Sequence, residues 1–112
     1  MRAFDASIRT EDATTVIDMT GLLDRTAEAR MNEVFATALA AGTGPVVFNF
    51  AGVEYINSTG IALVVGALAK ARTAGRQVRA FGLSDHYREI FTITRLSDFM
   101  GIFNDESAAV AG

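Results

Sequence analysis

A short polar segment, Asn57-Ser58-Thr59-Gly60, carries the side chains best suited to chemistry in this chain. It lies between an apolar run at 46–50 and a second apolar run with helical spacing, so it should form the turn that connects a strand to the following helix. The N–H groups and the positive dipole end at a helix N-terminus favour negative charge. The Ser58 hydroxyl is therefore a candidate phosphoacceptor, because a phosphate there would face those N–H groups.

A second interpretation of Ser58 is purely structural. Serine is a good helix N-cap, and its hydroxyl could do no more than accept an N–H bond worth about 0.5–2 kcal/mol. The residue types and their spacing leave both interpretations open.

Catalytic and metal-binding arrangements find no support in the sequence. The single histidine, His86, falls at the start of another predicted helix, and no motif links it to Ser58 as a base. The 57–60 segment lacks the spaced glycines and the Gly-Lys pair of a phosphate-binding loop, and the chain has no cysteine. We therefore expect a protein that is not an enzyme and that uses no cofactor and no metal.

Composition limits the partners. The 112 residues suit one domain, and half of them are hydrophobic, so the chain can bury a core. The net charge of -3 comes from acidic and basic residues spread along the chain, so we expect no nucleic-acid partner. No signal peptide is recognisable, and the longest apolar run, 61–69, is far shorter than the ~20 residues that cross a bilayer. We expect a cytoplasmic protein without membrane insertion.

Periodicity predicts strands that alternate with helices. The strands are expected at about 4–9, 14–20, 45–50, 77–82 and 99–103, and the helices at about 24–41, 58–74, 84–94 and 105–111. This order predicts a single small α/β domain: a mostly parallel sheet of four or five strands, an antiparallel N-terminal hairpin, and helices packed on the sheet. The turn at 21–24 and the 57–60 segment both follow strands, so both should lie at the same rim of the sheet.

The helix expected at 24–41 has a clear buried face. Asp24 suits its N-cap and Gly42 its end. The inward positions are Ala27, Met31, Val34, Phe35 and Ala38.

The helix that follows Ser58 has two apolar faces. The sheet should bury the stripe formed by Ile61, Val64, Val65 and Leu68. The opposite side consists of small or apolar residues: Ala62, Leu63, Gly66 and Ala67. Such a surface suits the docking of a partner, and it equally suits packing against a neighbouring helix. A charge introduced at Leu63 distinguishes the two, because docking predicts lost binding and packing predicts lost stability.

At this level the sequence resembles the STAS domain, the family of bacterial anti-sigma factor antagonists. The resemblance rests on the run VVFNF, on YINSTGIALVVGAL, on the Gly-x-Leu-Asp turn at 21–24, and on Leu83-Ser84 with Leu96. It extends over nearly all of residues 1–112.

The resemblance implies a function. In that family the first serine of the strand-to-helix corner, which is the 57–60 segment here, is phosphorylated by an ATP-binding partner that is both anti-sigma factor and serine kinase. The unphosphorylated antagonist binds that partner and thereby releases a sigma factor. It implies that Ser58 is the phosphoacceptor, with Thr59 as the secondary candidate, and that Gly60 permits close approach of the partner. The implied partner-binding surface comprises Asp24, Asn57, Ser58, Thr59, Gly60, Ala62, Leu63 and Gly66.

Two residues depart from the family pattern. Asn57 stands where the family usually has aspartate, and Arg95 stands where many relatives have glycine. Two alternatives therefore stay open: an unphosphorylated STAS adaptor in a stress-signalling or transporter complex, and a small-ligand-binding module at the same rim. The sequence leaves the oligomeric state open between monomer and weak dimer.

Overall fold

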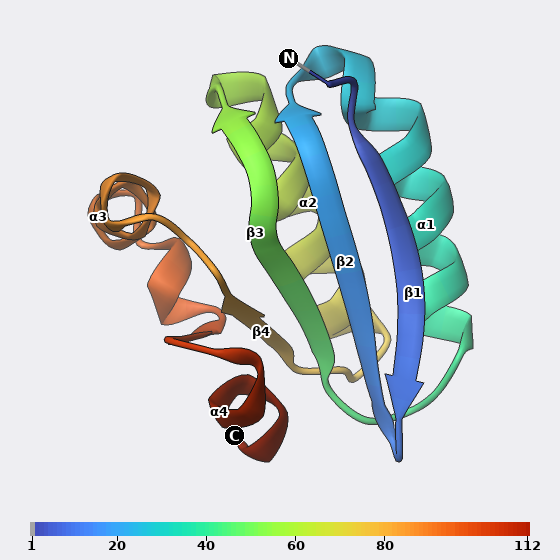
Figure 1. Cartoon of the computed structure of the whole chain (residues 1–112). Helices are drawn as coiled ribbons and strands as arrows, with labels where there is room; N and C mark the ends of the chain where they lie inside the picture. Colours follow the sequence, from blue (N-terminus) through green and yellow to red (C-terminus); the bar gives the residue numbers. More distant parts are fainter. Residues whose placement is uncertain (1) are drawn as a thin grey trace.

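The computed structural model describes residues 2–112, which form a five-stranded sheet flanked by helices (Figure 1). The strands are β1 (Asp5–Glu11), β2 (Thr14–Leu23), β3 (Val46–Ile56), β4 (Val78–Phe81) and β5 (Gly101–Phe103), in the spatial order β1-β2-β3-β4-β5. β1 runs antiparallel to β2, and every other pair is parallel. The predicted fold class, a mostly parallel sheet with an N-terminal hairpin, is confirmed.

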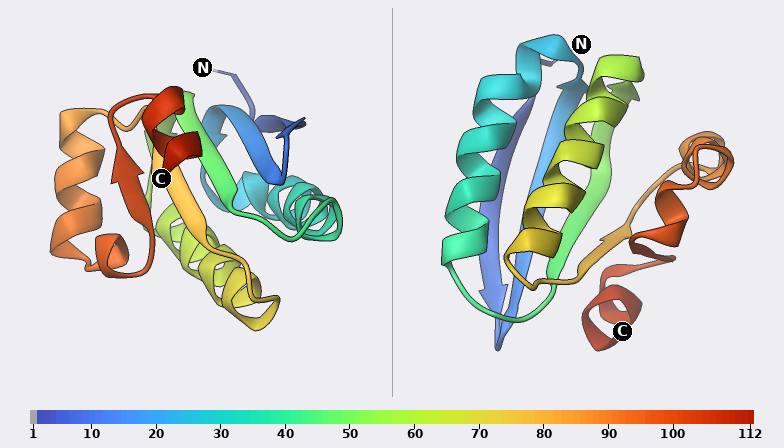
Figure 2. Two further views of the ribbon diagram at one scale, coloured as in Figure 1. Left: turned by 90° about the horizontal axis from the view of Figure 1, so that it is seen from below. Right: turned by 180° about the vertical axis from the view of Figure 1, so that it is seen from behind.

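The helices cover the sheet unequally. They are η1 (Arg25–Ala27), α1 (Glu28–Ala40), α2 (Ser58–Thr73), α3 (Asp85–Ile93), η2 (Leu96–Asp98) and α4 (Glu106–Ala111). α1 and α2 lie side by side on one face, and α4 covers part of the opposite face (Figure 2). The main core fills the space between the sheet and α1 and α2, and a smaller cluster around Val16, Val47 and Ala109 lies under α4. Residues 46–50 of β3 are covered on both faces, which explains their nearly continuous apolar sequence.

A row of aromatic rings runs through the main core. Phe35 of α1 stacks on Phe48 of β3 at 5.6 Å between ring centroids, and Phe48 neighbours Phe50 at 5.9 Å. Phe50 meets Phe91 of α3 edge to face at 5.6 Å. The row therefore ties α1, β3 and α3 into one core. All five inward positions predicted for the first helix are buried.

Two strands are longer than their sequence patterns predict. β3 continues to Ile56 where the prediction ended it at Phe50, and β2 continues to Leu23, beyond its predicted end at 20. The reason is mutual pairing, because the β2–β3 ladder extends from Thr15↔Val46 to Leu23↔Ile56. β4 accompanies β3 only as far as Asn49↔Phe81, so the far half of β3 is only partly covered and has a more polar sequence.

The predicted helix at 24–41 begins and ends differently. Its first turn is the 3-10 turn η1, capped by Asp24, and α1 proper ends at Ala40, before Gly42. The strand expected from Phe99 begins at Gly101, because residues 96–98 form a second 3-10 turn. The other ends differ from the predictions by one or two residues, which is usual for helix and strand termini.

Candidate functional site

The rim of the sheet brings the two predicted turns together. Leu23 and Ile56 are paired at the ends of β2 and β3, so Asp24 and Asn57 follow neighbouring strand ends. The backbone N–H of Asn57 donates to the carbonyl oxygen of Leu23 at 3.4 Å. The structure therefore places the carboxylate-bearing turn beside the 57–60 corner.

Asn57, not Ser58, caps α2. Its Oδ1 accepts a hydrogen bond from the backbone N–H of Gly60 at 2.9 Å, and its backbone is extended with φ of -103°. Ser58 is the first residue of the helix, and its side chain is exposed. The structural interpretation of the Ser58 hydroxyl as the cap is wrong, because the amide of Asn57 already fills that place.

The Ser58 hydroxyl has no hydrogen-bond partner among residues 2–112. The backbone N–H groups of Ser58 and Thr59 likewise find no acceptor within the part of the chain that the structure describes. An exposed hydroxyl beside two unpaired N–H groups at a helix N-terminus is a favourable place for an anion.

Gly60 faces the interior of the domain. It is buried, and a Cβ atom there would overlap the carbonyl oxygen of Leu23. Glycine therefore lets the N-terminus of α2 approach the end of β2. This packing explains the glycine within the domain itself, and the close approach of a partner that the resemblance implies at Gly60 stays a prediction.

The faces of α2 differ from the predicted ones. The buried side comprises Gly60, Val64, Ala67 and Ala71. Val65, predicted to be buried, is 48% exposed. The outward side forms a continuous stripe of Ser58, Ala62, Val65, Ala69 and Arg72, which we call the α2 stripe. Periodicity predicted a buried face here, but a helix rich in alanine has several apolar sides and the spacing does not identify which one meets the sheet.

The predicted docking residues divide between two environments. Ala62 is exposed on the α2 stripe, close to Ser58. Leu63 is half-buried and packs on the main core, whereas a Cβ at Gly66 would meet open space. On the same side, Lys70 Nζ donates to Asn32 Oδ1 of α1 at 3.3 Å. Leu63 therefore belongs in part to the packing of α2 beside α1.

Tyr87 is a residue at this rim whose role the sequence did not reveal. Its hydroxyl oxygen accepts a hydrogen bond from the backbone N–H of Ile56 at 3.0 Å, one residue before the cap of α2. Tyr87 belongs to the first turn of α3, which Ser84 caps by accepting from the Tyr87 backbone N–H at 3.2 Å. The sequence places Tyr87 in a predicted helix but does not reveal this hydrogen bond, because Ile56 is 31 residues away in the chain. Tyr87 fixes α3 against the end of β3.

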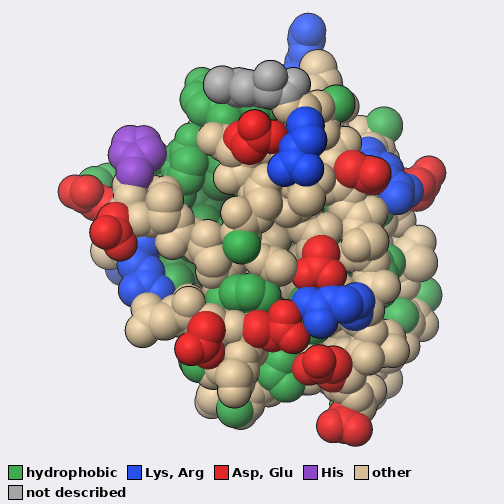
Figure 3. All heavy atoms as spheres, viewed as in Figure 1, with side chains coloured by type: hydrophobic (Ala, Val, Ile, Leu, Met, Phe, Trp, Pro, Cys, Tyr) green, Lys and Arg blue, Asp and Glu red, His purple; other side chains and the backbone are tan. Residues whose placement is uncertain are grey.

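Charged groups on the open face of the sheet are paired rather than gathered by sign (Figure 3). Arg9 binds Asp18 at 2.6 Å and Glu106 of α4 at 2.7 Å. The hydrogen bond from Arg9 lowers the pKa of Asp18 and, separately, the pKa of Glu106. This triad fastens α4 to the hairpin.

Among residues 2–112, no three or more His, Cys, Asp or Glu side chains gather as metal ligands would. Within the same residues, no helix has the length and apolar character needed to span a membrane.

Residues 6–102 match the family described as Mlab, STAS domain. The chain is 30% identical over 93 residues to an anti-sigma-B factor antagonist of Staphylococcus aureus, covering 83% of this chain and 86% of that protein. The corresponding protein of Staphylococcus epidermidis is 31% identical over the same length.

Solved structures share the fold. An anti-sigma factor antagonist from Mycobacterium paratuberculosis aligns with a TM-score of 0.79 at 17% identity, over 97% of this chain and 92% of that one. The Bacillus cell fate determinant SpoIIAA in its phosphorylated form aligns with a TM-score of 0.71 at 24% identity, over 97% and 98% of the two chains.

Proposed function

The chain belongs to the STAS domain family, and from that premise we propose that it is an anti-sigma factor antagonist controlled by phosphorylation of Ser58. Its partner is an ATP-binding protein that is both anti-sigma factor and serine kinase. The unphosphorylated protein binds this partner and releases a sigma factor, in the bacterial cytoplasm. The observation that carries the proposal is the exposed Ser58 hydroxyl, which has no hydrogen-bond partner within residues 2–112.

The corner can accept a phosphate without damage to the fold. The Asn57 side chain caps α2 by accepting from the Gly60 N–H, so modification of Ser58 removes no hydrogen bond that the helix needs. The N–H groups of Ser58 and Thr59 and the dipole of α2 would stabilise the added charge. Thr59 is half-buried, so Ser58 is the more accessible hydroxyl of the two.

The same phosphate would oppose binding of the partner. It adds about 1.5–2 negative charges at the start of the α2 stripe, next to the apolar Ala62. Asp24 already contributes a carboxylate at this rim, with its Oδ1 accepting from the Thr26 N–H at 2.9 Å. A partner surface that accommodates the Asp24 carboxylate would have to accommodate the phosphate as well. Because an unpaired charge at an apolar interface is costly, the phosphate would weaken binding.

Two variants test the switch. Ser58→Ala should fold normally and bind the partner constitutively, whereas Ser58→Asp should fold normally and bind at least tenfold more weakly. The measurement is titration of the purified partner kinase with each variant by calorimetry. Equal affinities for the two variants would remove the proposed switch.

Asn57 supports a second candidate, an adaptor that binds its partner without being modified. The residue keeps the cap but lacks the negative charge of the aspartate that the family usually has here. If that charge positions the kinase's magnesium nucleotide, Asn57 slows phosphorylation. Asn57→Asp should then raise the rate of phosphate incorporation, and an unchanged zero rate for both proteins would favour the adaptor.

A small-ligand-binding module at the rim is the remaining candidate. A cavity of about 200 Å³ lies nearby, between the far half of β3 and the start of α3, and Tyr87 is among its lining residues. Asp24, Asn57 and Ser58 do not line it. Nothing in its lining favours a ligand over the partner protein.

A further inference from the structure

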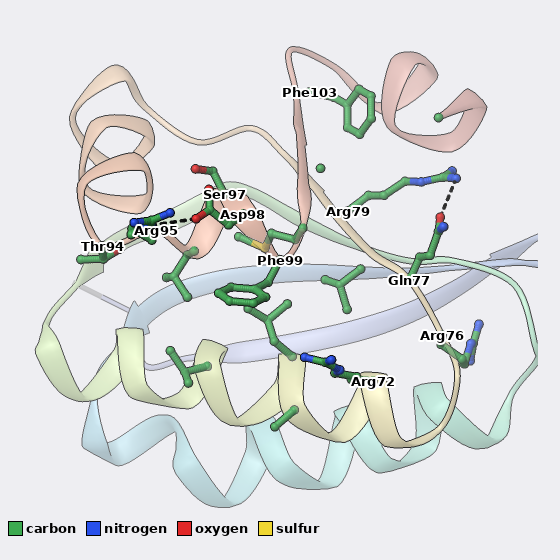
Figure 4. Close-up of a pocket in the computed structure, with 18 residues that line it drawn as sticks. Arg72, Arg76, Gln77, Arg79, Thr94, Arg95, Ser97, Asp98, Phe99 and Phe103 are labelled. Atoms are coloured by element: carbon green, nitrogen blue, oxygen red, sulfur yellow. Dashed lines mark hydrogen bonds and ion pairs between the residues drawn. The ribbon is translucent and has the colours of Figure 1, made fainter.

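A second, larger hollow lies at the other end of α2. It has a volume of about 950 Å³ and is bounded by the C-terminal half of α2, by β4, and by the segment 94–103 (Figure 4). We call it the α2–η2 groove. At about 1.5 Å per residue, Arg72 at this end lies roughly 21 Å along α2 from Ser58.

The groove exposes large apolar side chains. Phe99 is 65% exposed and Val65 is 48% exposed, and both line the groove. Leu68, Val78 and Met100 line it as well and are half-buried or buried. Folding gains nothing from leaving a phenylalanine in water, so a concentrated apolar surface of this kind is typical of a binding site.

Positive charge is concentrated around the apolar surface. The lining includes four of the chain's ten basic residues, Arg72, Arg76, Arg79 and Arg95, whereas Asp98 is the one acidic side chain that residues 2–112 contribute to it. The whole chain, by contrast, carries a net charge of -3. The groove is therefore a local excess of positive charge on an acidic protein.

The four arginines are differently engaged. Arg76 is buried, and its guanidinium donates to Ala38 O at 2.6 Å and to Thr15 Oγ1 at 3.0 Å, so it belongs to the core. Arg79 is half-buried and donates to two backbone carbonyls of α4 and to Gln77 Oε1 at 3.3 Å, and it has no carboxylate partner among residues 2–112. Arg72 is exposed and forms no ion pair within the same residues. Within the described residues, no carboxylate neutralises Arg72 or Arg79, and of the two the exposed Arg72 is the one whose guanidinium is not already hydrogen-bonded.

The cations lie at both ends of the groove. Figure 4 shows Arg72 and Arg79 on one side of Phe99 and Arg95 on the other. Arg95 binds Asp98 at 2.8 Å, but the two side chains are 80% and 47% exposed, so this ion pair is weak and can exchange partners. An amphiphile with a single anionic head could satisfy only one end. A segment that carries several carboxylates along an apolar face could satisfy both.

We propose that the α2–η2 groove binds an acidic amphipathic segment of a partner protein, with apolar side chains on Val65 and Phe99 and carboxylates on Arg72, Arg79 and Arg95. This interaction is separate from the switch at Ser58. A charge at Ser58 lies about two and a half Debye lengths from Arg72 at physiological ionic strength, so phosphorylation leaves the groove's affinity unchanged.

The test uses two synthetic peptides of equal length. One is a helix-forming peptide whose leucine face is flanked on both sides by glutamates, and its twin carries lysine in place of every glutamate. Binding is followed by fluorescence anisotropy and mapped by amide chemical shifts on the full chain. The acidic peptide should bind at least tenfold more tightly than its twin and should shift resonances of 65–72 and 94–103.

Charge reversal supplies the matched controls. Arg72→Glu should weaken the acidic peptide at least tenfold, whereas Arg25→Glu, the same change at an exposed site of η1 outside the groove, should not. Circular dichroism checks that both variants fold. Ser58→Asp should leave the affinity for the acidic peptide unchanged. The groove interaction can therefore fail while the switch at Ser58 stands, and the switch can fail while the groove interaction stands.

Three results would overturn the proposal. Equal affinity for the two peptides would show that charge plays no part. Shifts at 65–72 with dodecanoate but not with the acidic peptide would identify an anionic lipid as the occupant. Concentration-dependent self-association that protects Phe99 would identify a second copy of the chain.

Discussion

The two ends of α2 present opposite kinds of surface on one continuous stripe. The N-terminal end exposes the Ser58 hydroxyl and, within residues 2–112, two N–H groups without an acceptor at Ser58 and Thr59, beside the carboxylate of Asp24. From its midpoint to its C-terminus, the helix exposes Val65 and Arg72 beside Phe99, in a groove with an excess of arginine. The first end suits reversible addition of negative charge, and the second suits lasting contact with an apolar, acidic surface.

The difference shows how one helix can serve two interactions that do not interfere. Helix N-terminal groups act over a single turn, so the electrostatics at Ser58 do not extend to the groove. The buried side of α2, by contrast, is shared, because Gly60, Val64, Ala67 and Ala71 form one seam on the sheet. Substitutions in the seam should affect both ends, and substitutions on the stripe should affect one.

The largest effect is expected where the corner rests on the sheet. Gly60→Ala would force a methyl group into the carbonyl of Leu23 and should destabilise the protein by about 3 kcal/mol. Gly66→Ala is the matched control, because its methyl group meets open space and should stabilise the helix by about 0.5–1 kcal/mol. Urea denaturation measures both, and equal effects would contradict the packing assigned to Gly60.

Loss of the Asn57 cap should have a smaller effect than Gly60→Ala, and this effect should be confined to the 57–60 corner. Asn57→Ala removes the acceptor for the Gly60 N–H and should cost about 1 kcal/mol, whereas Asn57→Asp keeps the acceptor and should cost nothing. Denaturation curves give the two free energies, and amide shifts should change at 57–61 in the alanine variant. Changes that reached 94–103 would show that the two ends are coupled.

Acid should loosen α4, which lies on the opposite face of the sheet from α1 and α2, before it affects the 57–60 corner. The pKa values of Asp18 and Glu106 are lowered in the folded protein by hydrogen bonds from Arg9. Their contribution is therefore complete above the unfolded values of about 3.9 and 4.3 and is lost as pH falls through the folded values. Because these side chains are partly exposed, the loss should be about 1 kcal/mol or less.

Hydrogen exchange of α4 between pH 6 and pH 3 measures this loss. The protection factor of α4, which is its intrinsic exchange rate divided by its measured rate, should fall below about pH 4, while that of the first turn of α2 stays constant. Arg9→Gln should remove most of the difference. If α4 kept its protection at pH 3, the triad would not be what fastens it.

The smallest effect is expected at the rim of the groove. Arg95 adopts a left-handed backbone with φ of 66°, which suits glycine and disfavours arginine. Arg95→Gly should therefore stabilise the protein by about 0.5 kcal/mol, and it should weaken the acidic peptide several-fold. Thermal unfolding and anisotropy provide the two readings. A loss of stability would show that the Arg95–Asp98 pair outweighs the backbone strain.

Much of this architecture could be predicted from the sequence because it depends on local patterns. The inward face of α1 follows from helical spacing at Met31, Val34 and Phe35, and each of these is buried. The proximity of Asp24 to Asn57 follows from parallel strands that end at one rim. Both inferences need only the order of the helices and strands and the spacing of apolar residues within them.

Other features depend on contacts between distant residues. The length of β3 was missed because residues 51–56 are held by β2 rather than marked by their own composition. The packing role of Gly60 depends on the position of the Leu23 carbonyl. The groove joins residues 65–79 to residues 94–103, and no sequence period connects these segments.

The central claim is that Ser58 accepts a phosphoryl group from its partner kinase while the domain stays folded. The most direct measurement is the intact mass of the protein after incubation with that kinase and MgATP. The wild type should gain about 80 Da, the mass of a phosphoryl group, with an unchanged circular dichroism spectrum, and Ser58→Ala should gain nothing. No gain in the wild type, or an equal gain in Ser58→Ala, would contradict the claim.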